Sequence, residues 1–130
     1  QQPASQAPRS DRERSRPDLL MARDVAVVLQ EILDAISLIE EAAAGHDLAS
    51  FSADRFLQRG TERLLEIISE AVRHLPDDLL ATRKDVDWHG IRAIGNLMRH
   101  EYYRIDPDIV WNVVSDDLPP LRLVIEGFLA

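Results

Sequence analysis

The residues best suited to chemistry lie together in one short stretch, residues 89–104. On a helix, where successive residues turn by about 100°, the polar ones share a single ribbon: His89, Arg92, Asn96, Arg99, His100 and Tyr103. Arginine offers a fixed fork of donors to phosphate oxygens. Histidine can move a proton near neutral pH. The stretch therefore has the side chains that would act on a phosphodiester.

The same pattern is compatible with a plain solvated helix face, on which the charges are incidental. Taken by itself, His89 is more typical of a surface or helix-capping residue. The Asn96 side chain could simply form a hydrogen bond with the backbone or a neighbouring helix. The opposite side of the helix is apolar and is expected to face the core, through Ile91, Ile94, Leu97, Met98 and Tyr102. Spacing alone does not decide between the two interpretations.

Charge is distributed unevenly along the chain. The net charge is −8, which argues against indiscriminate binding to nucleic acid. Residues 83–104 nevertheless carry five Lys or Arg against three Asp or Glu, a local charge of +2. One segment of an acidic protein is thus positive, and it is the segment that holds the ribbon.

Several other kinds of site and location are disfavoured. There is no cysteine, and the four histidines lack the His-x-x-x-His spacing of a zinc site, so we expect no metal and no cofactor. No Gly-rich phosphate loop is present. No apolar run approaches the roughly 20 residues of a membrane span, and the first residues lack the order of a secretory signal. We expect a cytoplasmic protein without a membrane partner.

The elements that position the ribbon are predicted to be helices throughout. Residues 1–17 are rich in Gln, Ser, Pro and Arg and read as a flexible tail, although a basic arm that touches RNA is the alternative. Apolar residues at three- and four-residue spacing predict a helix over 18–44, ending near Gly45. A second helix is predicted over 52–75, broken at Pro76, with a short helical turn at 79–82.

The ribbon helix should run over 87–104, with Asp87 as its N-cap. Asp106-Pro107 predicts a short helix through Val114, and residues 116–119 repeat that pattern for a last helix to about Leu129. Asp106 is therefore better explained as a cap than as a catalytic acid. The fold class is all-α: an up-and-down bundle of four to five helices over residues 18–130.

The stretch WHGIRAIGNLMRHEYYRIDPDIVW resembles the HepT-like family of HEPN (higher eukaryotes and prokaryotes nucleotide-binding) domains. The family pattern is Trp, Arg-Asn, His-x-Tyr, Asp and a Val/Ile-Trp pair, and the matching residues are Trp88, Asn96, His100, Tyr102, Asp106, Val110 and Trp111. RLLEIISEAVRHLP at 63–76 and DDLPPL at 116–121 extend the resemblance to about residues 20–130.

The resemblance implies a homodimer in which two motif helices face each other across a cleft. Many members are metal-independent endoribonucleases, in which the ribose 2′-OH attacks the adjacent phosphate. By position, His100 would be the general acid or base and Asn96 would orient it or the phosphate. An arginine would stabilise the developing charge. The run of Glu62, Glu66 and Glu70 is typical of a solvated helix face, although Glu70 could pair with a motif arginine.

One departure from the family pattern concerns the arginine itself. The family places it directly before the Asn, where this chain has Gly95. Arg99 lies about one turn further on and Arg92 about one turn back, so either could supply the guanidinium. Otherwise the domain has lost catalysis and only binds. A helical glycine costs roughly 1 kcal/mol against alanine, which suggests that Gly95 serves close backbone approach at the dimer seam.

The resemblance also implies a partner. In similar toxins the tyrosine two after the motif His, here Tyr102, is adenylylated by a minimal nucleotidyltransferase antitoxin. The alternative is a tyrosine at the core edge. Tyr103 and Arg104 are candidate RNA-binding residues. The leading hypothesis is an RNA-cleaving toxin held silent by its antitoxin. The alternative is a catalytically inactive HEPN dimer that binds a nucleotide, RNA or the nucleotidyltransferase.

Overall fold

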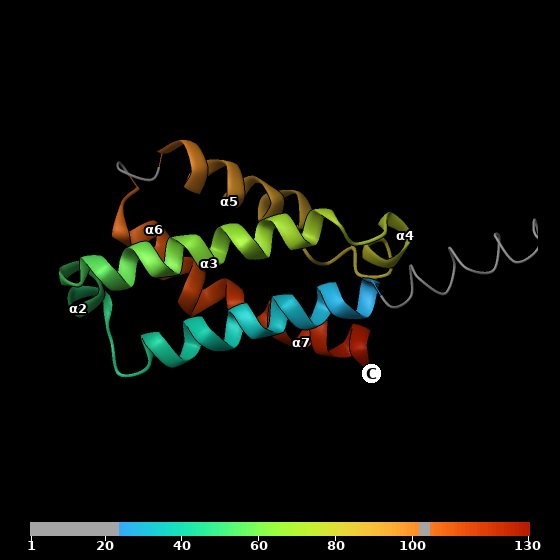
Figure 1. Ribbon diagram of the computed structural model, residues 1–130, viewed down its shortest axis with the longest axis horizontal. Coiled ribbons are helices and arrows are strands. Elements are labelled where there is room, and N and C mark those ends of the chain that lie inside the picture. Colours follow the sequence, from blue (N-terminus) through green and yellow to red (C-terminus); the bar gives the residue numbers. More distant parts are fainter. Residues whose placement is uncertain (1–23, 102–104) are drawn as a thin grey trace, which may run out of the picture.

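The chain is helical throughout the residues that the computed structural model describes, 24–101 and 105–130 (Figure 1). The predicted tail over residues 1–17 and the predicted helix start at residue 18 lie outside them. No strand occurs in the described ranges, and none of their helices is long and apolar enough to cross a membrane. The helices are residues 24–43, α2 (Leu48–Ala53), α3 (Arg55–Arg73), α4 (Asp77–Leu80), α5 (Trp88–Glu101), α6 (Pro107–Asn112) and α7 (Leu118–Leu129).

The first helix ends where the sequence predicts, but the second differs from expectation. Gly45 follows the first helix with φ of 79°, the left-handed conformation that glycine adopts most readily. The predicted helix over 52–75 is divided in two at Asp54. The carboxylate of Asp54 accepts a hydrogen bond from the Leu57 amide at 2.9 Å and so caps α3. An N-cap residue has extended backbone angles, which do not fit within a helix. Helix α2 therefore ends at Ala53, one residue before Asp54.

Two of the predicted helix starts are confirmed, and a third is wrong. The Asp87 carboxylate accepts from the Gly90 amide at 3.0 Å ahead of α5, and that of Asp106 accepts from the Asp108 amide at 3.1 Å ahead of α6. Asp117, by contrast, makes no capping bond and has helical backbone angles. A π-helical turn, Val113–Asp117, carries α6 directly into α7, so the chain does not break before Pro119.

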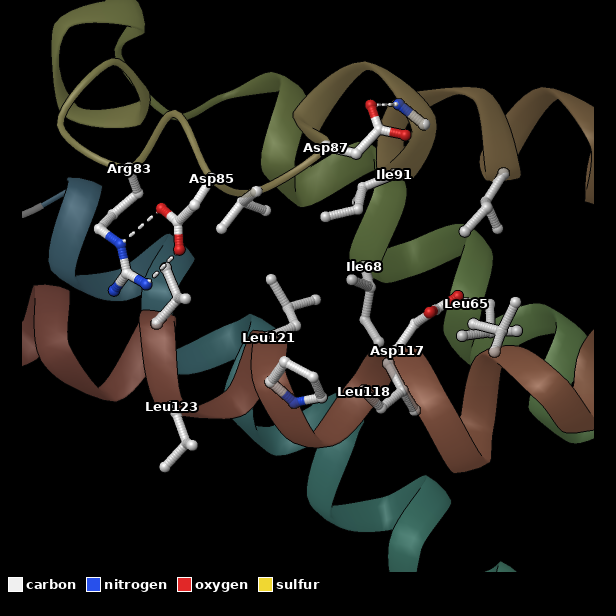
Figure 2. A pocket seen from close by; sticks show the side chains of 16 residues that line it. Leu65, Ile68, Arg83, Asp85, Asp87, Ile91, Asp117, Leu118, Leu121 and Leu123 are labelled. Atoms are coloured by element: carbon white, nitrogen blue, oxygen red, sulfur yellow. Dashed lines mark hydrogen bonds and ion pairs between the residues drawn. The ribbon is translucent and has the colours of Figure 1, made fainter.

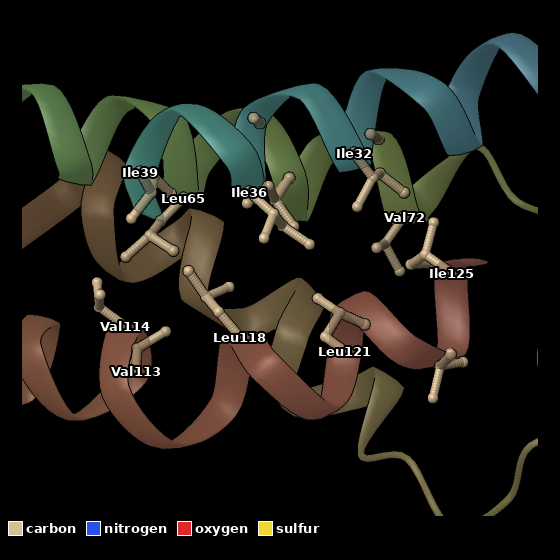
Figure 3. Close-up of a cluster of buried hydrophobic side chains, with 14 of the residues drawn as sticks. Ile32, Ile36, Ile39, Leu65, Val72, Val113, Val114, Leu118, Leu121 and Ile125 are labelled. Atoms are coloured by element: carbon tan, nitrogen blue, oxygen red, sulfur yellow. The ribbon is translucent and has the colours of Figure 1, made fainter. Parts of the chain in front are cut away.

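The core lies between the first helix, α3 and α7 (Figure 3). Each contributes one apolar stripe, which the three- and four-residue spacing of the sequence places on a single face. The buried members include Ile32, Ile36 and Ile39 of the first helix, Leu65, Ile68 and Val72 of α3, and Leu118, Leu121 and Ile125 of α7. Because α3 is central, it can offer its opposite side to α5.

The two tryptophans pack against the core, as their apolar rings predict. Trp88 is buried at the start of α5, where its indole N–H points to the carbonyls of Leu80 and Arg83, at 3.1 and 3.0 Å. Trp111 is half-buried, and its ring centroid lies 5.2 Å from that of Phe51. These contacts attach the start of α5 and helix α6 to their neighbours.

Candidate functional site

Two side chains of α3 form hydrogen bonds with the backbone of α5. Ser69 of α3 is 1% exposed. Its Oγ donates to the carbonyl of Arg92 at 2.9 Å and accepts from the amide of Gly95 at 3.0 Å. The Arg73 guanidinium also donates to the Arg92 carbonyl, at 3.2 Å. The side chains of α3 therefore bond to the backbone of α5 and fix how that helix is rotated.

Gly95 is the point of closest approach. A Cβ atom at this position would lie 2.5 Å from Ser69 Oγ and 2.9 Å from Ser69 Cβ. Real Cβ atoms do not come so near, so α5 can lie this close to α3 only with glycine there. The sequence predicts a close contact at Gly95, but with a second copy of the chain and not with Ser69. The expectation that Gly95 lies at a dimer seam is wrong, because Gly95 faces α3 of its own chain.

The outer face of α5 carries the exposed polar side chains His89, Asn96 and His100. Met98 is buried and Ile91 and Ile94 are partly buried, as the helical projection predicts. Leu97 was expected in the core, but it is 37% exposed. The contact through Gly95 turns α5 so that Leu97 lies beside the polar ribbon.

Arg99 is the arginine that the fold brings to this face. Its Nη2 lies 3.4 Å from Asn96 Oδ1, and its Nε lies 3.5 Å from Glu66 Oε2 on α3. The same Nη2 would be 3.5 Å from a Cβ atom on Gly95. The guanidinium of Arg99 thus occupies space beside the position where the family pattern places its arginine. Asn96 and Arg99 are brought together, and His100 follows them on the exposed side.

Arg92 lies in a different environment from Arg99, although the two arginines are equally good candidates in the sequence. Its side chain is half-buried, and its Nε is enclosed without a hydrogen-bond partner among the described residues. Its carbonyl is held by Ser69 and Arg73. Arg92 therefore belongs to the contact between α3 and α5 more than to the outer face. Of the two candidate arginines, Arg99 is the better placed to reach a ligand.

The acidic partner of Arg99 is Glu66, and the alternative that Glu70 pairs with a motif arginine is wrong. Glu70 pairs along its own helix with Arg73, at 3.8 Å, and with His74, at 3.4 Å. Glu66 lies one turn earlier and meets Arg99 across the two helices. Three further predicted site residues, Tyr102, Tyr103 and Arg104, lie outside the described residues.

The other flank of α5 borders an apolar cavity of about 620 Å³. Figure 2 shows its lining, which comes from α3, α5, α7 and the loop that precedes α5, with the Arg83–Asp85 ion pair at one end. Asp117 lies on this side, and its burial, with the charge of Asp116 adding to it, raises the pKa of the Asp117 carboxyl. None of the predicted site residues lines this cavity, so it is separate from the polar face.

Sequence reasoning missed Ser69 and Glu66, which organise the site from α3. Neither carries a local signal, since a serine and a glutamate on a helix are ordinary surface residues. The only clue is the helical glycine in the facing segment, which indicates that something must come close to it. Among the residues that the structure describes, no cluster of three or more His, Cys, Asp or Glu is arranged to hold a metal ion.

The similarity to known proteins extends over most of the chain. The sequence model of the family described as Ribonuclease HepT-like matches residues 32–127. The match includes α3, with Ser69 and Glu66, and α5, with the polar face. No solved structure matches the chain.

Three relatives illustrate the range of similarity. The protein named "Probable ribonuclease HepT" from Thermococcus cleftensis is 30% identical over 102 residues, which are 78% of this chain and 93% of the relative. A Methanocaldococcus jannaschii protein named as a candidate RNase is 29% identical over 104 residues, 80% of this chain and 95% of its own. Another from that organism, whose name joins a gamma-glutamylcyclotransferase to a candidate RNase, is 31% identical over 102 residues. These cover 78% of this chain but 46% of that longer protein.

Proposed function

Because the chain belongs to the HepT-like ribonuclease family, we propose that it is a metal-independent endoribonuclease, the toxin of a HEPN/nucleotidyltransferase toxin–antitoxin pair. The observation that carries this proposal is the exposed face of α5, where Asn96 and Arg99 lie together beside His100. These groups suit the attack of a ribose 2′-OH on the adjacent phosphate. The products would be a 2′,3′-cyclic phosphate and a 5′-OH end.

Each group has a distinct role in that reaction. His100 transfers the proton, either from the 2′-OH or to the leaving 5′ oxygen. Arg99 donates to the phosphate oxygens, on which negative charge increases in the transition state. Asn96 bonds to Arg99 and orients the guanidinium.

A second copy of the chain would supply a second set of these groups, which is why we propose a homodimer. A monomer in sedimentation at micromolar concentration would contradict it.

The proposed activity is tested by incubating the purified protein with single-stranded RNA in excess EDTA. We expect cleavage to continue, because the proposed chemistry uses only side chains. The cleaved 3′ ends should be cyclic phosphates, detected by mass spectrometry. An RNA with 2′-deoxyribose at the cleaved position should remain intact, since it lacks the nucleophile. Cleavage of that deoxy substrate, or loss of activity in EDTA, would contradict the mechanism.

The two arginines should behave differently when each is replaced by alanine. We expect Arg99→Ala to lower kcat by about 100-fold or more, the usual cost of removing one preorganised donor, with little change in Tm. Arg92→Ala should instead lower Tm, because it removes a half-buried side chain from the contact between α3 and α5. Thermal melts and initial cleavage rates on both variants separate the two roles. Equal kcat losses with unchanged Tm values would show that Arg92 also reaches the RNA.

The antitoxin is proposed to act on Tyr102. Adenylylation would add a negative charge and a bulky group two residues from His100 and so hinder RNA binding. The measurement is the intact mass of the protein after incubation with ATP and the cognate nucleotidyltransferase. The natural chain should gain the mass of one adenylyl group, AMP less one water, with release of pyrophosphate, and Tyr102→Phe should not. A gain that persists in Tyr102→Phe would place the modification elsewhere.

A second candidate function is favoured by Gly95, because the family pattern's arginine has no room at that position. On this alternative the chain is a catalytically inactive HEPN dimer that binds RNA, a nucleotide or the nucleotidyltransferase. It predicts binding without cleavage. The deoxy and natural RNA substrates would then behave alike.

A further inference from the structure

A row of ion pairs lies beside the polar face, on α3. Arg59 and Arg63 are one turn apart, and each pairs with the glutamate three residues later, Glu62 and Glu66. Glu66 also meets Arg99 from α5, so its two oxygens serve two arginines. Arg63 Nη1 lies 2.7 Å from Oε1, and Arg99 Nε lies 3.5 Å from Oε2. One carboxylate thereby holds the guanidiniums of two helices side by side.

The surface is hollowed on both sides of this arrangement. A cavity of about 270 Å³ is lined by the three arginines, the two glutamates and Met98. A second, of about 410 Å³, adjoins the first helix and again includes Arg63, Glu66 and Arg99. The smaller cavity carries three positive and two negative side chains. Its lining is therefore cationic in a chain of net charge −8.

Arg63 is the outermost member. Its side chain is 68% exposed, whereas that of Glu66 is 22% exposed. A guanidinium has five N–H donors in a planar fork, and the hydrogen bond from Arg63 Nη1 to Glu66 Oε1 uses one of them. The rest of this exposed guanidinium can donate to phosphate oxygens without breaking the ion pair.

We propose that Arg63 binds an RNA phosphate neighbouring the one at Arg99, and that Glu66 is a positioning residue that holds both guanidiniums. The RNA backbone would then run from α5 onto α3. This inference rests on the proposed function, since it assumes that RNA is the ligand of the α5 face.

The test measures RNA binding apart from cleavage. Labelled single-stranded RNA is titrated into His100→Ala protein, and affinity is followed by fluorescence anisotropy at several salt concentrations. Arg63→Gln in that background should weaken binding about ten-fold, the value of one charged hydrogen bond. It should also lower the slope of log K against log salt by about 0.7, the share of one phosphate on a single strand. The matched control is Lys84→Gln, an exposed residue that lines neither cavity.

Each outcome has a separate meaning. If Arg63→Gln matches Lys84→Gln in affinity and slope while the parent protein binds RNA, the inference fails and the proposed function stands. If the parent binds no RNA, both fail. If Arg63→Gln disturbs only antitoxin binding, the surface serves a protein and the inference is overturned.

Glu66→Gln supplies an independent arm, measured on cleavage in the natural background. Removing the negative charge should lower KM for RNA, because it lessens repulsion of the phosphates. The same change should lower kcat, because Arg99 loses its ionic anchor. A merely structural role for Glu66 would alter Tm and leave both kinetic constants unchanged, and that result would overturn the positioning role.

Discussion

His100→Ala is expected to lower kcat for RNA cleavage by about 100- to 10,000-fold, the usual contribution of a positioned general acid or base. His100 lies on the exposed side of α5, so its removal should change Tm by no more than about two degrees, as for other surface changes. The measurement is the initial rate of RNA cleavage at saturating substrate, compared between the natural protein and the variant.

His89→Ala provides the matched control. His89 is also exposed and lies on the same face of α5, three turns earlier. We expect His89→Ala to keep its activity, because Asn96 and Arg99 gather at the other end of the helix. Cleavage that persists at the natural rate in His100→Ala would remove the assignment of this histidine and point to a contaminating nuclease.

Gly95→Ala is expected to destabilise the protein by about 1–3 kcal/mol, the usual cost of overpacking. Alanine favours an isolated helix over glycine by about 1 kcal/mol, so helix propensity alone predicts the opposite sign. The difference arises because the new Cβ would collide with Ser69 Oγ and Cβ, which belong to a buried residue of α3. Chemical denaturation measures the free energy of unfolding, and Gly95→Arg should be more damaging still.

Gly60→Ala is the control for this prediction. Gly60 lies within α3, and a Cβ there would meet nothing within 4 Å. Alanine at position 60 should therefore stabilise the fold by up to about 1 kcal/mol. Relief should also come from Ser69→Gly, which removes both colliding atoms. In that background we expect Gly95→Ala to cost little or to stabilise. Equal stabilisation by Gly95→Ala and Gly60→Ala in the natural chain would contradict the contact.

The helical fold could be predicted largely from local chemistry. Asp87 and Asp106 cap helices because their short carboxylates reach the amides of the next turn, and Gly45 ends one because it adopts a positive φ. The same rule fails at Asp117, which resembles a cap in sequence but has helical angles. Tertiary packing of the apolar residues on either side keeps that helix continuous, and local propensity is too weak to oppose it.

The site could be predicted only as a stretch of sequence. The helical period predicts which residues share a face of α5. The rotation of α5 about its own axis depends on the contact of Gly95 with Ser69, and these residues are 26 apart in sequence. That rotation exposes Leu97 and half-buries Arg92, both contrary to expectation. It also selects Arg99 over Arg92. An ion pair between residues far apart in sequence produces no periodic pattern, so the pairing of Glu66 with Arg99 could not be predicted.

The hydroxyl of Ser69 has an evolutionary consequence. Two positions on different helices share one small volume, so neither can change in size without the other. A homologue with arginine at the position of Gly95 must carry a smaller residue opposite it, or hold its two helices further apart. Substitutions at these two positions should therefore covary among homologues.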